Sequence, residues 1–222
     1  NTFSGGGGAA NAARMDWMEG LATDGTNLYI SNQFQHCIHK VDSSGVITQF
    51  IGLCGTLGNT DGTLASARLR SPMDMVSDPR NPTNFFVVDQ SDQTTGSIKY
   101  VNLNGGADVD VGGVSVIDQQ IKNVFSVNGG YPQAVTYWQD TDANKDLVCY
   151  SSGAQSNGAL GSHNVICKER ISGNTSIRIG SSDGGLVKGG TQVEKEQEGL
   201  TWNSGTKVLS ATLHGPAGLA FD

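Results

Sequence analysis

The sequence predicts an all-β protein of the β-propeller class, built from units of four antiparallel strands. Residues 20–52 read as a short apolar strand, an Asp24-Gly25 turn, a second strand, a connection, a third strand, a Ser44-Gly45 turn and a fourth strand. This phrase returns along the chain, with echoes that begin at Pro72, at Pro132 and at Glu198 or Pro216. Glycine makes up 31 of the 222 residues and only 16% are charged, so turns are plentiful and charged helices few. Short strands repeated at long intervals are typical of propeller blades.

The first unit displays its elements most clearly. Its four strands are predicted at Gly20–Asp24, Asn27–Asn32, Cys37–Asp42 and Val46–Gly52. The glycines of the two tight turns between them tolerate the positive φ that such hairpins require.

The next two units repeat this order. In the second unit we expect strands at Met73–Ser77, Phe85–Gln90 and Ser97–Leu103, with a looser fourth strand within 107–117. In the third unit we expect strands at Gln133–Tyr137, Asp146–Ser151, Asn164–Ile171 and Ser176–Gly180. Alternating apolar and polar residues in these runs predict strands with one packed and one wetter face.

A glycine-rich connector separates successive units. Residues 55–72 run from a glycine-rich loop into Ala-Ser-Ala-Arg-Leu and Ser-Pro, residues 5–15 are a shorter relative, and residues 213–222 look like the end of a connector followed by a new first strand. We therefore expect one propeller region, 1–222, with about four visible blades, as part of a larger propeller completed by further sequence or by other chains. The approximate blade bounds are 15–54, 69–117, 130–182 and an incomplete 198–222.

These phrases resemble the repeats of NHL-type β-propellers, which read Pro-x-Gly-Ile-Ala-Val-Asp, then a strand, then an Arg-Ile-x-Lys-like third strand and Asp-x-x-Gly. The matching segments are Cys37-Ile-His-Lys-Val-Asp-Ser-Ser-Gly45 and Gly218-Leu-Ala-Phe-Asp222, and the 55–72 connector looks like that of bacterial extracellular NHL proteins. The resemblance covers most of 1–105, weakens through 106–190 and returns at the end. It implies the fold, whereas this propeller serves enzymes and binding modules alike.

Four cysteines stand in two pairs that flank strand connections. Cys37 begins a third strand and Cys54 follows the fourth, while Cys149 and Cys167 flank a loop of Ser, Gly, Ala and Asn. This placement predicts two disulfides and an oxidising compartment: extracellular, periplasmic or at the cell surface. The alternative is four buried free thiols. Neither pair has the CxxC spacing of zinc or redox sites.

One local motif has oxygen-bearing side chains at every second position: Asp140, Asp142, Asn144 and Asp146. It resembles the start of an EF-hand loop and the calcium loops of integrin-type propellers, so it is a candidate for structural calcium. Lys145 replaces the expected glycine and no closing acidic residue follows. The alternative is an ordinary polar turn, since Asp and Asn favour turns. No other cofactor is expected.

An enzyme would place metal ligands on the innermost strands, around a central channel. Glu19 and Glu198 both precede Gly-Leu at the start of such a strand, and Glu198-Gly-Leu-Thr-Trp202 looks like the metal-binding motif of gluconolactonase-like propellers. The alternative for both is a capping or solvated glutamate. Strand alternation places Cys37 and His39 on one face and His36 on the other, which does not make a convergent zinc site. No motif transfers the zinc histidines of the NHL-like amidating lyases to this chain.

Composition and charge limit the function classes. A net charge of −7 without a basic stripe argues against nucleic acid, and no apolar run is long enough to span a bilayer. Asn174-Thr-Ser is a possible glycosylation site. The aromatic residues Trp17, Tyr131, Tyr137, Trp138 and Trp202 either line one rim or pack between blades. We expect a non-enzymatic binding or adhesion module, or a structural part of a surface assembly, that contacts protein or glycan through rim loops. The alternative is a channel-centred lactonase-like or lyase-like metalloenzyme.

Overall fold

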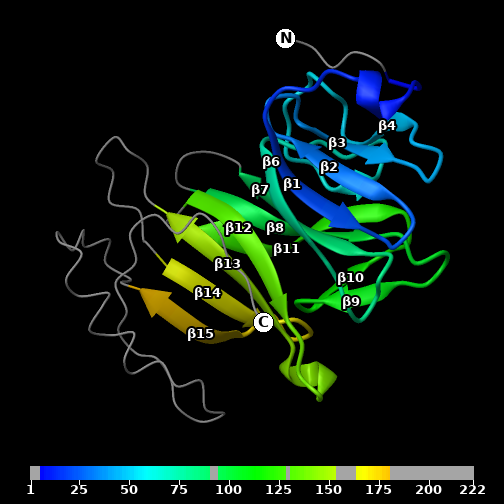
Figure 1. Cartoon of the computed structure of the whole chain (residues 1–222). Coiled ribbons are helices and arrows are strands. Elements are labelled where there is room, and N and C mark those ends of the chain that lie inside the picture. The colour runs from blue at the N-terminus through cyan, green and yellow to red at the C-terminus, as the bar shows by residue number, and fades with distance from the viewer. Residues whose placement is uncertain (1–5, 91–94, 129–130, 154–163, 181–222) are drawn as a thin grey trace, which may run out of the picture.

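The computed structural model describes residues 6–90, 95–128, 131–153 and 164–180 (Figure 1). The predicted fourth unit at 198–222 lies outside these ranges. Within them the chain is all-β, as predicted, and its strands form four antiparallel sheets, none of which closes on itself. Two short 3₁₀ helices accompany them, η1 at Ala10–Ala12 and η2 at Ala143–Lys145.

Three of the sheets contain a run of strands that pair in sequence order. The first sheet contains β1 (Met18–Thr23), β2 (Leu28–Asn32), β3 (Cys37–Val41) and β4 (Ile47–Ile51). The second contains β6 (Pro72–Ser77), β7 (Phe85–Gln90), β8 (Thr95–Asn102), β11 (Gln120–Asn128) and the short β5 (Gly62–Thr63) at its edge. The third contains β12 (Tyr131–Trp138), β13 (Leu147–Gly153), β14 (Asn164–Glu169) and β15 (Thr175–Gly180).

The fourth strand of the second sheet does not lie where the sequence predicted it. Residues 107–117 instead form a separate hairpin of β9 (Val109–Val111) and β10 (Val114–Val116). Gly112 and Gly113, with φ of 61° and 75°, turn this segment back on itself. The eight residues of β8 pair along their whole length with β11, which has nine. The alternating valines of 109–116 therefore indicated β structure correctly but assigned it to the wrong sheet.

A β-bulge recurs at the same place in the first strand of all three main sheets. In β1 the pair Met18–Asn32 is followed by Leu21–Ile30, so β1 advances three residues while β2 advances two. The same step separates Pro72–Asp89 from Met75–Val87, and Pro132–Ser152 from Val135–Tyr150. One extra residue at one fixed register is a conformational feature that unrelated hairpins do not share by accident. The three sheets are therefore structural repeats of one unit.

Successive sheets pack with their first strands side by side, so that β6 lies between β1 and β12 (Figure 1). One buried cluster joins the first and second sheets through residues such as Tyr29, Ile38, Met75 and Phe85. A second cluster joins the second and third sheets and the β9–β10 hairpin. The second sheet is thus the only one of the three, among the described residues, that shares an apolar cluster with both of the others.

The outer strands of two sheets are covered by the segment that precedes each sheet. Gly7 and Ala10 donate backbone hydrogen bonds to the carbonyls of Ile47 and Gly45, alongside β4. In the second sheet β5, which lies in the connector, pairs with β11. The connector that the sequence repeats thus satisfies edge groups that would otherwise be open to another chain.

Candidate functional site

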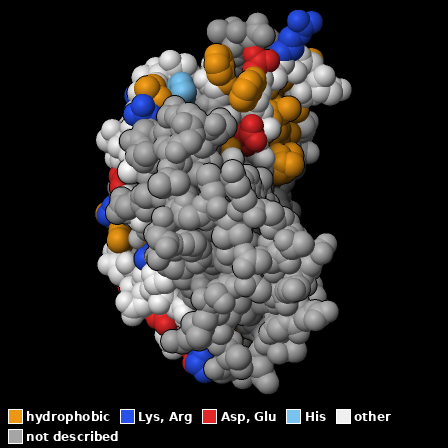
Figure 2. All heavy atoms as spheres, turned by 90° about the vertical axis from the view of Figure 1, so that its left-hand side faces the viewer, with side chains coloured by type: hydrophobic (Ala, Val, Ile, Leu, Met, Phe, Trp, Pro, Cys, Tyr) orange, Lys and Arg blue, Asp and Glu red, His pale blue; other side chains and the backbone are white. Residues whose placement is uncertain are grey.

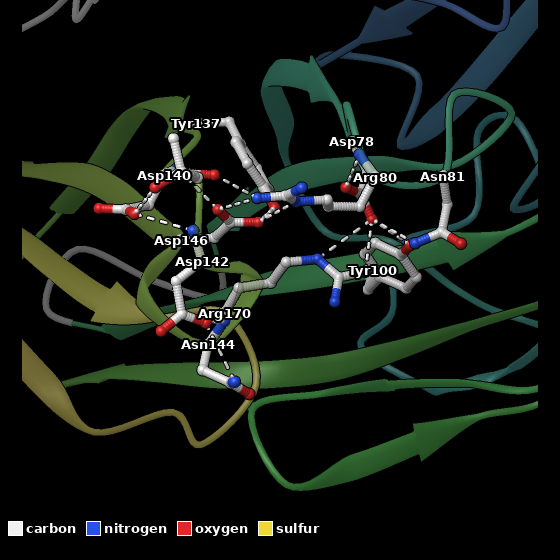
Figure 3. Close-up of polar contacts among 11 residues, drawn as sticks. Asp78, Arg80, Asn81, Tyr100, Tyr137, Asp140, Asp142, Asn144, Asp146 and Arg170 are labelled. Atoms are coloured by element: carbon white, nitrogen blue, oxygen red, sulfur yellow. Dashed lines mark hydrogen bonds and ion pairs between the residues drawn. The ribbon is translucent and has the colours of Figure 1, made fainter.

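A polar network lies where the strand connections of the second and third sheets meet (Figure 3). Arg80 lies in the β6–β7 loop and Asp146 in the β12–β13 loop. The Arg80 guanidinium donates two hydrogen bonds to the Asp146 carboxylate, from Nε to Oδ2 over 2.7 Å and from Nη2 to Oδ1 over 2.9 Å. Arg80 also donates to the backbone carbonyl of Asp140. Asp146 is fully buried, whereas 27% of the Arg80 side chain is exposed. This two-point ion pair fixes the end of the third sheet against the second.

A second ion pair lies beside the first. Arg170, which follows β14, donates from Nη2 to Asp78 Oδ2 over 2.6 Å, and both side chains are buried. The same carboxylate oxygen accepts from the Tyr100 hydroxyl at 2.6 Å and from Asn81 Nδ2 at 3.1 Å. The guanidinium of Arg170 also lies over the Tyr100 ring, 5.9 Å from its centroid. The buried Asp78 charge is therefore paired and hydrogen-bonded from several directions, as burial requires.

The pKa shifts in this network follow from burial and from hydrogen bonds between its members. Burial opposes ionisation of Asp146, but hydrogen bonds from Arg80 and Tyr137 outweigh it and hold the Asp146 pKa below its usual value. Burial and the neighbouring carboxylates raise the pKa of Tyr100 and of Tyr137. Both tyrosines are therefore hydrogen-bond donors at neutral pH and not general bases.

The predicted calcium motif belongs to this network, and its side chains are used by the turn itself. Asp140 Oδ1 accepts from the Asp142 amide at 2.9 Å, and Asp142 Oδ1 accepts from the Asn144 amide at 3.0 Å. Asp146 Oδ1 accepts from Arg80 and the Asp140 amide, and Asp146 Oδ2 accepts from Arg80 and Tyr137. Four donors occupy the four acceptor positions of this carboxylate. In the loop as folded, a cation would therefore have to displace one of these donors to reach Asp146.

The equivalent turns of the other sheets support this description of the loop. In the first sheet Asp24 Oδ1 accepts from the amides of Thr26 and Asn27, and Asp24 Oδ2 accepts from the Tyr29 hydroxyl at 2.7 Å. In the second sheet Asp78 likewise accepts from a loop amide and from a tyrosine. An aspartate that organises the turn after the first strand is thus part of the repeat, and its recurrence needs no metal ion.

The residues of the alternative channel metal are not brought together by the described structure. Glu19 is exposed at the start of β1, and Glu198 lies outside the described residues. His163 and His214 also lie outside them. Asn174 is exposed in the β14–β15 turn, where a glycan would be accessible.

Both predicted cysteine pairs are disulfide-bonded. Cys149 and Cys167 face each other directly on β13 and β14, with 4.0 Å between their Cα atoms. The bond between Cys37 and Cys54 ties the start of β3 to the loop after β4. His39 Nε2 lies 3.6 Å from Cys37 Sγ and 3.9 Å from Cys54 Sγ. Strand alternation placed Cys37 and His39 on one face and the Cys37–Cys54 pair was predicted, but the contact of His39 with both sulfurs was not.

A buried charged group in the second sheet also escaped the sequence analysis. Lys99, 1% exposed, donates to Asp61 Oδ1 at 2.7 Å, and Asp61 lies in the connector. Asp89 is equally buried; its Oδ1 accepts the amides of Arg70 and Ser71, while its Oδ2 has no hydrogen-bond partner. Burial raises the pKa of Asp89 to about 6 against the opposing effects of Lys99 and the two amides. The alternation of β8 predicted a packed face with Ile98 and Tyr100 and a wetter face with Lys99, and the second part of this prediction is wrong, because both faces of β8 are buried.

Among the candidate rim aromatics, Trp17 is 67% exposed, whereas Tyr137 is buried in the polar network and Trp138 packs on the apolar cluster around the second disulfide. Trp202 and the Tyr131 side chain lie outside the described part of the structure. Of these aromatics, Trp17 is thus the described one that is free to contact a partner.

Comparison with known proteins adds no relative. No protein-family model matches the chain, and no curated protein matches it significantly. No helix in the described part of the chain is long and apolar enough to cross a membrane.

Proposed function

We propose that the chain is a segment of an NHL-type β-propeller that acts outside the cytoplasm as a non-enzymatic binding module within a larger assembly. Three repeated units of four strands, with first strands side by side, support the propeller. The two disulfides support an oxidising compartment.

The observation that carries this proposal is the exposure of β1. Leu21 is 60% exposed, whereas the residues at the same register after the bulge in the other sheets, Met75 and Val135, are 4% and 3% exposed. Met18 is 55% exposed, whereas its counterparts Pro72 and Pro132 are buried. Met75 shares a buried cluster with residues of the first sheet, and Val135 shares one with residues of the second. The first sheet therefore presents a face suited to one more sheet of the same repeat.

A rim next to this face offers a contact surface for protein or glycan. Trp17 and Phe34 are 67% and 55% exposed, and the Gln33 amide donates to the Trp17 carbonyl, so the two aromatic residues lie on adjoining segments. Figure 2 shows exposed hydrophobic side chains gathered near acidic ones in the upper part of the molecule. Exposed aromatic residues stack on sugars and anchor protein interfaces.

A metalloenzyme of the lactonase or amidating-lyase kind remains the alternative, but nothing in the described residues favours it. Such an enzyme needs carboxylates or histidines from several sheets around one ion. Among the described residues, the closely spaced set of three potential ligands is Cys37, His39 and Cys54, all from the first sheet and its following loop. A divalent metal bound near Glu19 in the isolated protein would support the enzyme instead.

The docking face is tested by the association of the protein in solution. We expect concentration-dependent association in sedimentation experiments, because the exposed β1 face buries itself against another sheet. The double variant Met18→Ser/Leu21→Ser should remain monomeric. The matched control Leu57→Ser/Ile117→Ser, which removes two residues that are 52% and 47% exposed elsewhere, should associate like the wild type. Equal association of both variants would contradict the proposal.

The rim is tested separately with glycan and cell-surface protein arrays. We expect binding that is lost in Trp17→Ala/Phe34→Ala but kept in Met18→Ser/Leu21→Ser. Binding that survives removal of both aromatic residues would place the contact surface elsewhere.

A further inference from the structure

We propose that Cys37, His39 and Cys54 form a redox-gated site for a thiophilic divalent metal ion such as Zn²⁺. In the oxidised protein the two sulfurs are bonded to each other. After reduction they become thiolate ligands and, with the imidazole of His39, hold the ion in the same place.

The first step of the argument is the distance from the imidazole nitrogen to each sulfur. His39 Nε2 lies 3.6 Å from Cys37 Sγ and 3.9 Å from Cys54 Sγ. Tetrahedral zinc with ordinary Zn–S and Zn–N bond lengths sets its nitrogen and sulfur ligands about 3.6 Å apart. The two edges of a coordination tetrahedron that include nitrogen are therefore already present. Only the two sulfurs have to separate.

The backbone around the cluster fixes two ligands and allows the third to move. Cys37 and His39 are fully buried on β3, which is paired to β2 on one side and β4 on the other. Cys54 is only partly buried and lies in a short loop, anchored by its amide to Gln49 Oε1 at 3.2 Å and by the Gly55 amide to the Gln35 carbonyl. A small shift of this loop separates the sulfurs, and its partial exposure provides entry for the ion.

The chemistry of the three ligands suits the ion. The imidazole of His39 lies beside both sulfurs and supplies the nitrogen of a mixed sulfur–nitrogen ligand set of the kind that Zn²⁺ binds in proteins. Two thiolates and one divalent cation sum to zero charge, which makes the ion tolerable at a buried position. Three protein ligands leave a fourth coordination position open to water on the Cys54 side.

The redox step balances with an external reductant. A trialkylphosphine gives two electrons to the Cys37–Cys54 bond and becomes a phosphine oxide by taking the oxygen of a water molecule. The two protons of that water complete two thiols. Zn²⁺ then displaces both thiol protons into solvent and binds the sulfurs together with the lone pair of His39. The disulfide and the metal are thus alternative links between β3 and the loop after β4.

The second disulfide provides an internal contrast. Cys149 and Cys167 are likewise buried, but in the described part of the chain no histidine or carboxylate completes a close group of three with them. Reduction there yields two thiols on facing strands without a third ligand. The proposal therefore assigns metal binding to one of two otherwise similar cysteine pairs.

Co²⁺ is the probe for this site, because its thiolate charge-transfer and d–d bands report sulfur ligands and tetrahedral geometry. The phosphine-reduced wild type, kept anaerobic, should bind one Co²⁺ per chain, and Zn²⁺ should displace it. The oxidised protein should show no such bands. Reduced Cys149→Ser/Cys167→Ser should bind like the wild type, whereas Cys37→Ser/Cys54→Ser should not.

The role of His39 as a metal ligand is tested by comparing variants of His39 and His36. His39→Asn should weaken Co²⁺ binding at least tenfold and shift the d–d bands. His36→Asn changes a partly exposed histidine in the connection just before β3 and should do neither. Zn²⁺ should raise the melting temperature of the reduced wild type but not that of reduced His39→Asn, and this comparison holds even if a cysteine variant fails to fold. A reduced protein that binds no Co²⁺, binds it equally in both histidine variants, or unfolds despite Zn²⁺ overturns the proposal.

Discussion

The buried carboxylate of Asp78 shows how single residues connect the sheets. It lies at the end of the first strand of the second sheet, yet its charge is neutralised by Arg170, 92 residues away in the third sheet. Because both side chains are buried, the cost of removing two charges from water offsets much of their attraction, so the intact pair adds little net stability. Removing one member of the pair is destabilising, since it leaves the other as an uncompensated buried charge.

We expect Arg170→Met to lower the free energy of unfolding by about 3 kcal/mol, because Asp78 then retains its charge without a cation. Urea denaturation measures this change. Arg170→Met/Asp78→Asn should recover part of the loss, since the buried charge is gone, and Arg14→Met, at an exposed arginine, should change little. If Arg170→Met and the double variant are equally stable, the unpaired Asp78 charge is not the cause of the lower free energy of unfolding.

Asp89 should make stability depend on pH in the direction opposite to an ordinary salt-bridged aspartate. Its pKa is raised to about 6 in the folded protein, from 3.8 for a free side chain. The stabilising contribution of the protonated form is therefore complete below pH 3.8 and is lost as the pH rises to about 6. Asp89→Asn should remove this loss. As the pH rises from 3.8 to 6, the free energy of unfolding of the variant should therefore increase relative to that of the wild type by up to about 3 kcal/mol, at roughly 1.4 kcal/mol per pKa unit.

Unfolding free energies of Asp89→Asn and wild type at several pH values test this expectation. Asp110→Asn, which changes an exposed carboxylate on β9, is the control and should run parallel to the wild type. If the curve of Asp89→Asn also runs parallel to that of the wild type, the carboxyl group does not titrate in this range.

Calcium should not stabilise the protein through the loop at residues 140–146. Asp146 already accepts four hydrogen bonds, two of them from Arg80, so an ion would have to displace a charged partner. We expect the melting temperature to be the same with added calcium and with a chelator. A calcium-dependent rise that is lost in Asp142→Asn would restore the metal-site interpretation.

Residue-level predictions from sequence succeeded where the partner is near in the chain. The Cys37–Cys54 bond spans 17 residues and one hairpin, so strand order alone brings the pair together. The calcium prediction for Asp146 rests on oxygen-bearing neighbours that are local in sequence, whereas Arg80, which binds this carboxylate, lies 66 residues away. Sequence spacing reveals a local turn but not a tertiary partner, and that partner determines what the carboxylate does.

At the scale of elements, the repeated bulge fixes how the first strands of successive sheets approach one another. Gly20 is one of the two residues in the β1 bulge, and a Cβ there would lie 2.7 Å from Asp74 Cα and 2.8 Å from Met75 N on β6. The close approach of the two backbones therefore requires glycine at this position. The Gly20 amide donates to Ser31 Oγ at 2.7 Å, and the equivalent amide of Ala134 donates to Ser151 Oγ at 3.0 Å.

We expect Gly20→Ala to lower the free energy of unfolding by about 3 kcal/mol, because the backbones of β1 and β6 must move apart. Gly25→Ala is the matched control: its φ is +86° but no atom would lie within 4 Å of the new Cβ, so only backbone strain of about 1 kcal/mol arises. Thermal or urea denaturation of the two variants distinguishes contact from strain. A larger loss at Gly25 than at Gly20 would contradict the packing described for these strands.

Element order could be predicted from sequence wherever turns carried glycine or aspartate, as in the first and third sheets. For the second sheet the prediction of the last strand was wrong, because residues 107–117 have the alternation of an outer strand and directly follow β8 in the sequence. Alternation does not say with which strand a segment pairs. The Gly112-Gly113 turn makes the segment pair with itself, and β8 then takes the next alternating run, β11.

At the scale of the whole molecule, the three sheets differ in how many neighbours cover them. Apolar clusters lie on both sides of the second sheet, whereas the first sheet presents Met18 and Leu21 to solvent on the side away from β6. Stability of repeated units that contact only their neighbours is carried by those interfaces. The sheet with two interfaces should therefore open last, and the sheet with an uncovered face should open first.

Native-state hydrogen exchange should resolve this order. We expect the slowest amide exchange in β7 and β8, whose residues are almost all buried, and markedly faster exchange in β1, where burial alternates with exposure. Association that covers Met18 and Leu21 should slow exchange in β1 selectively, because only that strand gains an interface. Uniform protection across the three sheets in the monomer would mean that they unfold as one cooperative unit. The exposed face of β1 would then not be the weak point that another sheet of the same repeat is expected to stabilise.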